Sequence, residues 1–327
     1  MPEQSGSRRR GATSVPELVA SARAGEARAV ARLISLVEDE SPLLREVTAA
    51  LAPHTGHAHV IGLTGSPGVG KSTSTDALIR ALRQEGRRVG VLAIDPSSPF
   101  SGGALLGDRV RMGDHATDDG VYIRSMAARG HLGGLSWSTP QAMRVLDAAG
   151  FDVVLVETVG VGQSEVEVAG LADTTVVLLA PGMGDGIQAA KAGILEIGDV
   201  YVVNKADREG ADQVARDLRG MLSLGDRRDG GWQQPILKTV AQVGEGVPEV
   251  VSALDEHRAW LESSGQLARR RTRRARAEIE AIAVAALRRR WAVVGEHDEL
   301  DHLAAAVVDG SSDPYAAADR LLGVVSG

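Results

Sequence analysis

The stretch that decides the fold lies at residues 65–72 and reads Gly65-Ser66-Pro67-Gly68-Val69-Gly70-Lys71-Ser72. It matches the pattern G-x-x-x-x-G-K-[ST] without a break, and in this pattern the glycines let successive backbone N–H groups wrap a chain of phosphates. The apolar run Val60–Thr64 precedes the stretch and a helical segment follows it. Lys71 is then expected to reach the β- and γ-phosphate oxygens, and Ser72 to place its hydroxyl on Mg²⁺. The sequence therefore predicts a binding site for a nucleoside triphosphate.

Short apolar runs alternate with helical segments from about residue 59 to residue 240. The runs are continuous in apolar residues, which is typical of parallel strands buried on both faces. The segments between them, such as 71–85 and 139–149, are long enough for crossover helices. This order predicts an α/β fold of the P-loop NTPase type, Rossmann-like, with a mostly parallel sheet. The expected strands are Val60–Thr64, Val89–Ile94, Val121–Arg124, Val153–Val156, Thr175–Leu179, Val200–Val203 and Ile236–Val240.

A second motif, Asn204-Lys205-Ala206-Asp207, directly follows the run Val200–Val203. Ligand-binding loops of an α/β sheet lie at such strand ends. Asn-Lys-x-Asp is the pattern with which guanine-nucleotide-binding proteins read the base. The Asp carboxylate accepts hydrogen bonds from the guanine N1–H and exocyclic amine, and a site built in this way leaves that carboxylate unpaired when ATP enters. The sequence therefore favours GTP over ATP.

Acidic residues suited to Mg²⁺ follow two of the strands and one loop. Asp95 ends the second expected strand, Glu157 ends the fourth, and Asp108 follows the segment 97–103. The segment that begins at Glu157 and includes Gly160 and Gln163 is similar to the D-x-x-G element that senses a γ-phosphate, with Glu in place of Asp. Mg²⁺ keeps several of its waters and needs few protein carboxylates. The predicted metal ligands are Ser72, Asp95, Asp108 and Glu157.

Helical segments are expected on both sides of this region. On the N-terminal side, Ser14 and Glu17 have the spacing of a capping box, and Ser41-Pro42 has the form of an N-cap and N1 pair that opens a helix ending at Leu51. On the C-terminal side, Asp313-Pro314 is predicted to cap a final helix ending at Leu322. The predicted parts are a disordered N-terminus (1–13), a helical extension (14–58), a nucleotide-binding domain (59–258) and a C-terminal helical region (259–327).

The composition narrows the class of protein. The 327 residues are 43% hydrophobic and 24% charged, which is ordinary for a globular protein of about two domains. The formal net charge of −7 argues against general binding of nucleic acids. The chain has no cysteine, so disulfides and thiolate metal sites are excluded. No apolar run approaches the ~18 residues of a membrane span, and we expect a cytoplasmic protein that does not enter a membrane.

The motifs, taken together, resemble the MeaB/ArgK family of P-loop GTPases, the bacterial relatives of the human methylmalonic aciduria type A protein. The similar stretches cover most of 59–207 in the order of the family. They are GSPGVGKST at 65–73, IDPSSPFSGGALLGDRVRM at 94–112, IRSMAARGHLGGLS at 123–136, DVVLVETVGVGQSE at 152–165 and PGMGDGIQAAKAGILEIGDVYVVNKAD at 181–207.

The resemblance implies an activity and a partner. Members of the family hydrolyse GTP slowly and escort an adenosylcobalamin-dependent acyl-CoA mutase, usually methylmalonyl-CoA mutase, whose cofactor loading they gate and protect. Asp95 would lie near the attacking water, and Asp108 and Glu157 would join Ser72 around Mg²⁺. The C-terminal helices of the family form a homodimer, which assigns the region 259–327 to dimerisation.

The resemblance also extends the set of site residues. The segment from Asp185 to Lys191 corresponds to a mobile loop that relays the nucleotide state to the mutase. Independently of the resemblance, Arg109 and Arg111 lie close to Asp108 in the sequence and are candidates for stabilising the transition state. The residues expected to hold GTP or GDP are Gly65, Ser66, Pro67, Gly68, Val69, Gly70, Lys71, Ser72, Thr73, Asn204, Lys205, Asp207, Thr239, Val240 and Ala241. The last three stand where such GTPases often have Ser-Ala.

Three other functions remain open on sequence alone. His54, His57 and His59 cluster before the first strand, as in a metal-insertion GTPase, because clustered histidines bind nickel or zinc. A P-loop kinase or transport-associated ATPase would need an acceptor pocket or a membrane partner, for which we find no signature. The arginine run at 269–276 forms a local basic patch, but it has no aromatic stacking partners for nucleic acid.

Overall fold

The computed structural model describes residues 14–96, 115, 117–128, 138–158, 164–182, 195–223, 231–294 and 297–325. The chain divides into two compact units, Met1–Leu267 and Ala268–Gly327. The first contains the sheet with the helices that cover it. The second contains most of α11 (Gln266–Val294) together with α12 (His297–Val308) and α13 (Pro314–Val325).

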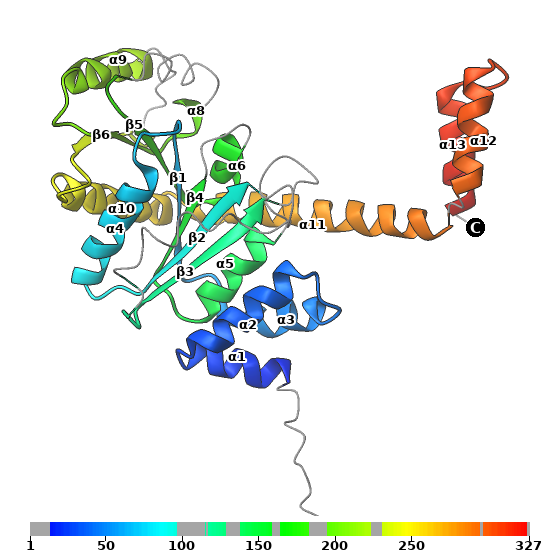
Figure 1. The fold of residues 1–327 in the computed structure, drawn as a ribbon, viewed down its shortest axis with the longest axis horizontal. Helices are drawn as coiled ribbons and strands as arrows, with labels where there is room; N and C mark the ends of the chain where they lie inside the picture. The colour runs from blue at the N-terminus through cyan, green and yellow to red at the C-terminus, as the bar shows by residue number, and fades with distance from the viewer. Residues whose placement is uncertain are drawn as a thin grey trace, which may run out of the picture. The chain divides into compact units, whose positions relative to one another are not determined.

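The first unit is built on a seven-stranded sheet in the order β3-β2-β4-β1-β5-β6-β7 (Figure 1). Every pair of neighbouring strands is parallel, and all residues of β1, β4, β5 and β6 are buried. This confirms the predicted α/β fold. The strands are β1 (His59–Thr64), β2 (Val89–Pro96), β3 (Val121–Ala128), β4 (Val153–Thr158), β5 (Thr174–Leu179), β6 (Val200–Asn204) and β7 (Ile236–Thr239).

Helices cover both faces of the sheet, and the side chains of each strand divide between them. On one face, Ile61 and Leu63 of β1 pack in a core with α4 (Lys71–Gln84) and α10 (Val247–Ser263). On the other face, Val60 packs with α5 (Thr139–Ala148), α6 (Ser164–Leu171) and the N-terminal helices. The short α8 (Leu195–Ile197) and α9 (Ala211–Ser223) complete the unit. Because β1 is buried on both sides, the loop at its end has a rigid base.

The N-terminal helices are α1 (Val15–Arg23), α2 (Ala27–Glu38), α3 (Leu44–Leu51) and the one-turn 3₁₀ helix η1 (Ala52–His54). The capping box at the start of α1 is confirmed, since the Ser14 N–H donates to Glu17 over 2.9 Å and the Glu17 N–H donates to Ser14 Oγ over 3.4 Å. The prediction for α3 is wrong at its start. A turn precedes the helix, and in this turn the Leu44 N–H donates to the Ser41 carbonyl over 2.8 Å. Ser41 therefore does not cap the helix directly.

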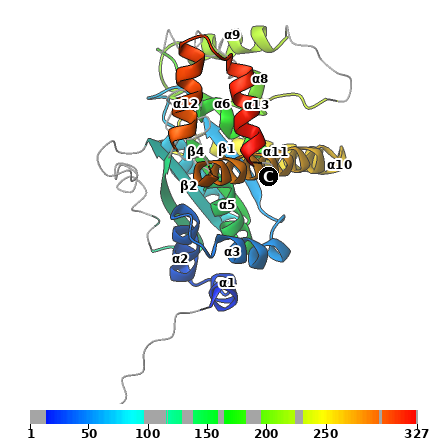
Figure 2. The same ribbon diagram turned by 90° about the vertical axis from the view of Figure 1, so that its right-hand side faces the viewer.

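The second unit holds a small core of its own. Leu303 of α12 packs with Ala317 and Leu321 of α13, and Figure 2 shows these two helices side by side. As predicted, Asp313 caps α13, with Oδ1 accepting the N–H groups of Tyr315 and Ala316 over 2.9 and 3.0 Å. The helix continues three residues past the predicted end at Leu322, to Val325. Among the described residues, none of the helices is both long enough and apolar enough to cross a membrane.

A buried histidine lies at the start of β1. The His59 side chain is 2% exposed, and its Nε2 lies 2.7 Å from Thr174 Oγ1. The same hydroxyl is 2.8 Å from Nδ1 of His257, which is fully buried. Burial disfavours the charged imidazolium and lowers the pKa of His59 from 6.5 to about 4. The negative charge of Asp173 raises this pKa, but by less than burial lowers it. His59 is therefore neutral in the folded protein at neutral pH.

The lowered pKa of His59 predicts that the protein loses stability in mild acid. Because this pKa is lower in the folded than in the unfolded chain, the contribution of His59 to the free energy of unfolding is complete above pH 6.5. That contribution is lost as the pH falls toward 4. Between pH 7 and pH 5 the free energy of unfolding should fall by about 2 kcal/mol more in the wild type than in a His59→Gln variant, whose amide does not titrate. Urea unfolding of both proteins at each pH measures this difference. Equal losses in the two proteins would contradict the assignment.

Candidate nucleotide-binding site

The loop after β1 has the backbone that the motif requires. Gly65, Gly68 and Gly70 have φ values of 144°, 79° and 95°, which side-chain-bearing residues rarely adopt. A Cβ on Gly70 would lie 2.5 Å from Asn204 Nδ2, so this glycine is also needed for close packing. The next residue, Lys71, begins α4. The N–H groups at the start of that helix therefore face the loop, where they favour an anion.

Lys71 is held at the centre of the loop. Its side chain is buried, and the ammonium group donates to the carbonyl of Gly65 over 2.6 Å and to that of Ser66 over 3.1 Å. The contacts place a full positive charge beside the partial charges of the loop N–H groups and the helix N-terminus. The loop is thus suited to bind a polyphosphate.

Two hydroxyl groups of α4 hold a buried carboxylate. Ser72 Oγ donates to Glu157 Oε1 over 2.6 Å, and Thr75 Oγ1 lies 2.9 Å from Glu157 Oε2. Glu157 is in β4, next to β1 in the sheet, and is 4% exposed. A hydroxyl and a carboxylate are hard oxygen donors of the kind that Mg²⁺ prefers, so Ser72 and Glu157 fit a role in metal binding. Sequence reasoning missed Thr75, because nothing in the run at 72–75 distinguishes it from its neighbours.

One asparagine joins three loops at the carboxyl edge of the sheet. Asn204, at the end of β6, donates from Nδ2 to the Val69 carbonyl over 2.9 Å. Its Oδ1 accepts from Thr239 Oγ1 and from the Ala241 N–H, each over 3.1 Å. Asn204 therefore brings together the predicted phosphate loop and both predicted base loops, although they are far apart in the sequence.

The two residues after Asn204 also contact the phosphate loop and the loop at 239–241. Lys205 has a φ of 58° and donates from Nζ to the Gly68 carbonyl over 2.6 Å. The Ala206 N–H donates to the Thr239 carbonyl over 3.0 Å. Asp207 is exposed on the same loop, and Val240 is half-buried between Thr239 and Ala241. Asp207 is thus accessible to a ligand beside the phosphate loop.

Asp95 lies on the strand that pairs with β4. Asp95 is in β2, two positions beyond Ala93, which is level with Glu157 on the neighbouring strand. Its backbone is therefore placed at the same edge of the sheet as the phosphate loop. Asp108, Arg109, Gly160, Gln163, Asp185 and Lys191 lie outside the described residues.

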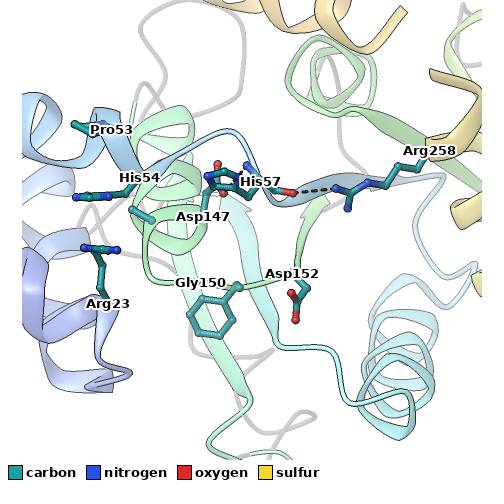
Figure 3. Close-up of a pocket in the computed structure, with 10 residues that line it drawn as sticks. Arg23, Pro53, His54, His57, Asp147, Gly150, Asp152 and Arg258 are labelled. Atoms are coloured by element: carbon teal, nitrogen blue, oxygen red, sulfur yellow. Dashed lines mark hydrogen bonds between the residues drawn. The ribbon is translucent and has the colours of Figure 1, made fainter. Parts of the chain in front are cut away.

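The three clustered histidines do not form one site. His59 is turned into the interior toward Thr174, whereas His54 and His57 line a cavity of about 400 Å³ (Figure 3). The cavity lies near the amino ends of β1 and β4, opposite the phosphate loop. Among the described residues, no group of three or more His, Cys, Asp or Glu side chains is arranged to hold a metal ion.

The polar groups of this cavity fix the connection into β1. Asp147 accepts the N–H groups of Gly56, His57 and Ala58 over 2.5, 3.1 and 2.9 Å. Arg258 donates to the His57 carbonyl over 3.0 Å (Figure 3). These contacts support the chain between η1 and β1.

Comparison with known proteins adds independent evidence. The model of the family described as methylmalonyl Co-A mutase-associated GTPase MeaB matches residues 30–295. A Pyrococcus abyssi protein assigned as a GTPase is 47% identical, over 96% of this chain and 97% of its own. The mouse mitochondrial methylmalonic aciduria type A homolog is 40% identical, over 64% of this chain and 52% of its own. The crystal structure of a LAO/AO transport system kinase superposes with a TM-score of 0.72 and 27% identity, covering 96% of this chain and 98% of the other.

Proposed function

The chain belongs to the MeaB family of P-loop GTPases, and we propose that it is a GTP-hydrolysing chaperone that binds an adenosylcobalamin-dependent acyl-CoA mutase and gates or protects the loading of its cofactor. The family name supports methylmalonyl-CoA mutase as the client, and isobutyryl- and ethylmalonyl-CoA mutases are the alternatives. The observation that carries the nucleotide assignment is the set of hydrogen bonds of Asn204, which donates to the phosphate loop and accepts from the loop at 239–241.

In this proposal the phosphates and the base are held at opposite ends of one site. The Lys71 ammonium and the backbone N–H groups of residues 65–73 other than Pro67, which has none, bind the phosphates. Asp207 accepts hydrogen bonds from the guanine N1–H and amino group. Ser72 and Glu157, with Asp95 and Asp108, would hold Mg²⁺, which neutralises charge on the β- and γ-phosphate oxygens when it is bound. Asp95 would orient the attacking water, and Arg109 would stabilise the developing charge.

The proposal extends to the parts that communicate with the client. Gly160 and Gln163 would respond to the γ-phosphate, and the loop from Asp185 to Lys191 would pass the response to the mutase. The helical region 259–327 would form a homodimer. The exposed apolar side chains of α11 support this role, because Ile279 is 68% and Leu287 is 59% exposed in the single chain. The chaperone would act in the cytoplasm.

A hydrolysis assay tests the nucleotide and the client together. The purified chain should hydrolyse GTP slowly and ATP not measurably, because adenine does not satisfy the Asp207 carboxylate. Adding stoichiometric methylmalonyl-CoA mutase should raise the GTP rate several-fold, whereas an unrelated CoA-dependent enzyme should not change it.

The possible outcomes separate the two parts of the proposal. GTP turnover that ignores methylmalonyl-CoA mutase but responds to one of the other two mutases would change the client alone. A lack of response to all three would overturn the chaperone role. ATP turnover as fast as GTP turnover would contradict the base assignment and favour a P-loop ATPase.

A further inference from the structure

We propose that Thr75 is a positioning residue for Mg²⁺: its hydroxyl fixes the rotation of the Glu157 carboxylate so that Oε1 stays directed at Ser72. This inference rests on the proposed function, in which Ser72 and Glu157 take part in metal binding. Thr75 itself would not contact the metal or the nucleotide.

The geometry of α4 gives Glu157 two hydroxyl partners on one side of a helix. Ser72 and Thr75 are three residues apart, a spacing that places side chains on the same helix face. They contact different oxygens of Glu157: Ser72 Oγ is 2.6 Å from Oε1, and Thr75 Oγ1 is 2.9 Å from Oε2. The contact of Thr75 with Oε2 therefore limits rotation of the carboxylate plane about its contact with Ser72.

The Thr75 hydroxyl has two acceptors for its single proton. Besides Glu157 Oε2 at 2.9 Å, the carbonyl of Lys71 lies 3.1 Å from Oγ1. The contact with Glu157 is the shorter, and a carboxylate is the stronger acceptor because it carries a full charge. Both properties direct the hydroxyl proton toward Glu157.

Burial makes this support difficult to replace. The Thr75 side chain is fully buried and Glu157 is 4% exposed, so bulk water does not reach the pair to take over a lost hydrogen bond. Residues that orient a metal ligand in this way typically change metal affinity by about 10–100-fold when they are removed. The expected effect of losing the Thr75 hydroxyl is therefore on the metal and not on the nucleotide.

The test compares Mg²⁺ dependence in matched variants of the full chain. Thr75→Val keeps the shape of the side chain and removes the hydroxyl. Binding of a fluorescent, non-hydrolysable GTP analogue is measured during a Mg²⁺ titration and again in EDTA. We expect Thr75→Val to need about tenfold more Mg²⁺ for half-saturation, with an affinity in EDTA within twofold of the wild type. Ser74→Ala is the control, since Ser74 Oγ is buried one position away on α4 and has no hydrogen-bond partner among the described residues. This variant should leave the Mg²⁺ requirement unchanged.

A second pair of variants covers a folding failure of Thr75→Val. Thr75→Ala and Thr75→Ser both lose the γ-methyl group but differ in the hydroxyl. Thr75→Ala should need about tenfold more Mg²⁺ than Thr75→Ser, and equal requirements in this pair, or in Thr75→Val and the wild type, would overturn the inference. If the wild type itself binds the analogue equally in Mg²⁺ and EDTA, the proposed metal site fails instead.

Discussion

Replacing Lys71 with alanine is expected to weaken binding of GTP and GDP at least about 100-fold, a loss of about 2.7 kcal/mol. The side chain is 7% exposed, and its ammonium group is fixed against the phosphate loop by the carbonyls of Gly65 and Ser66. The substitution therefore removes a positioned charge from a place where water screens it weakly. Titration with a fluorescent GDP analogue measures the loss.

A control on the same helix separates this effect from a general change in charge. Arg80 is also on α4, but its side chain is 51% exposed and pairs with Asp76 over 2.6 Å. Arg80→Ala removes the same unit of charge outside the loop and should change nucleotide affinity less than threefold. Micromolar GTP affinity retained in a folded Lys71→Ala variant is inconsistent with the phosphate assignment.

Asp207→Asn is expected to reverse the choice of base from guanine to xanthine. The carboxylate accepts two hydrogen bonds from guanine, whereas an asparagine amide donates to the additional carbonyl of xanthine. A site that depends on a hydrogen bond discriminates strongly against a ligand that lacks it. GTP should lose at least about 100-fold in affinity and XTP should gain. Because Asp207 is exposed, the fold should be unaffected.

GTP and XTP each compete with a fluorescent GDP analogue for the site, and the two competition curves give the ratio of their affinities. Asp212→Asn is a matched control: it makes the same substitution on α9, where the carboxylate is exposed and pairs with Lys238. This variant should keep the preference of the wild type for GTP. An unchanged ratio in Asp207→Asn would remove Asp207 from base recognition and leave the choice between GTP and ATP without its main support.

The strands and the phosphate loop could be predicted from the sequence because their signals are local. Each of the seven strands begins within one residue of its predicted start, since buried parallel strands are runs of apolar residues. The glycine spacing at 65–70 likewise reflects a backbone requirement that is met within the loop. The prediction that a helix begins at Ser41-Pro42 was wrong even though its signal is also local. The residue types suit a helix start, but the turn closed by Leu44 delays the helix.

The sequence could not show the contacts between segments that are distant along the chain. The order of the strands, which places β4 between β1 and β2, follows from packing and not from any one run. The same is true of Thr75, whose partner Glu157 is 82 positions away. The spacing of the three histidines groups His59 with His54 and His57, yet the partner of His59 is Thr174, 115 positions away. Spacing in the sequence gives no information about such pairs.

The hydrogen bonds of Asn204 also bear on the order in which the protein is assembled. Val69 and Asn204 are 135 positions apart, and two further partners of Asn204, Thr239 and Ala241, come 35 and 37 positions after it. On the ribosome, the phosphate loop emerges long before the residues that brace it. A nascent chain that ends before residue 204 therefore has the motif without its support, and should acquire nucleotide affinity only after β6 and β7 have joined the sheet. Truncation from the C-terminus, measured as a function of length, would locate that step.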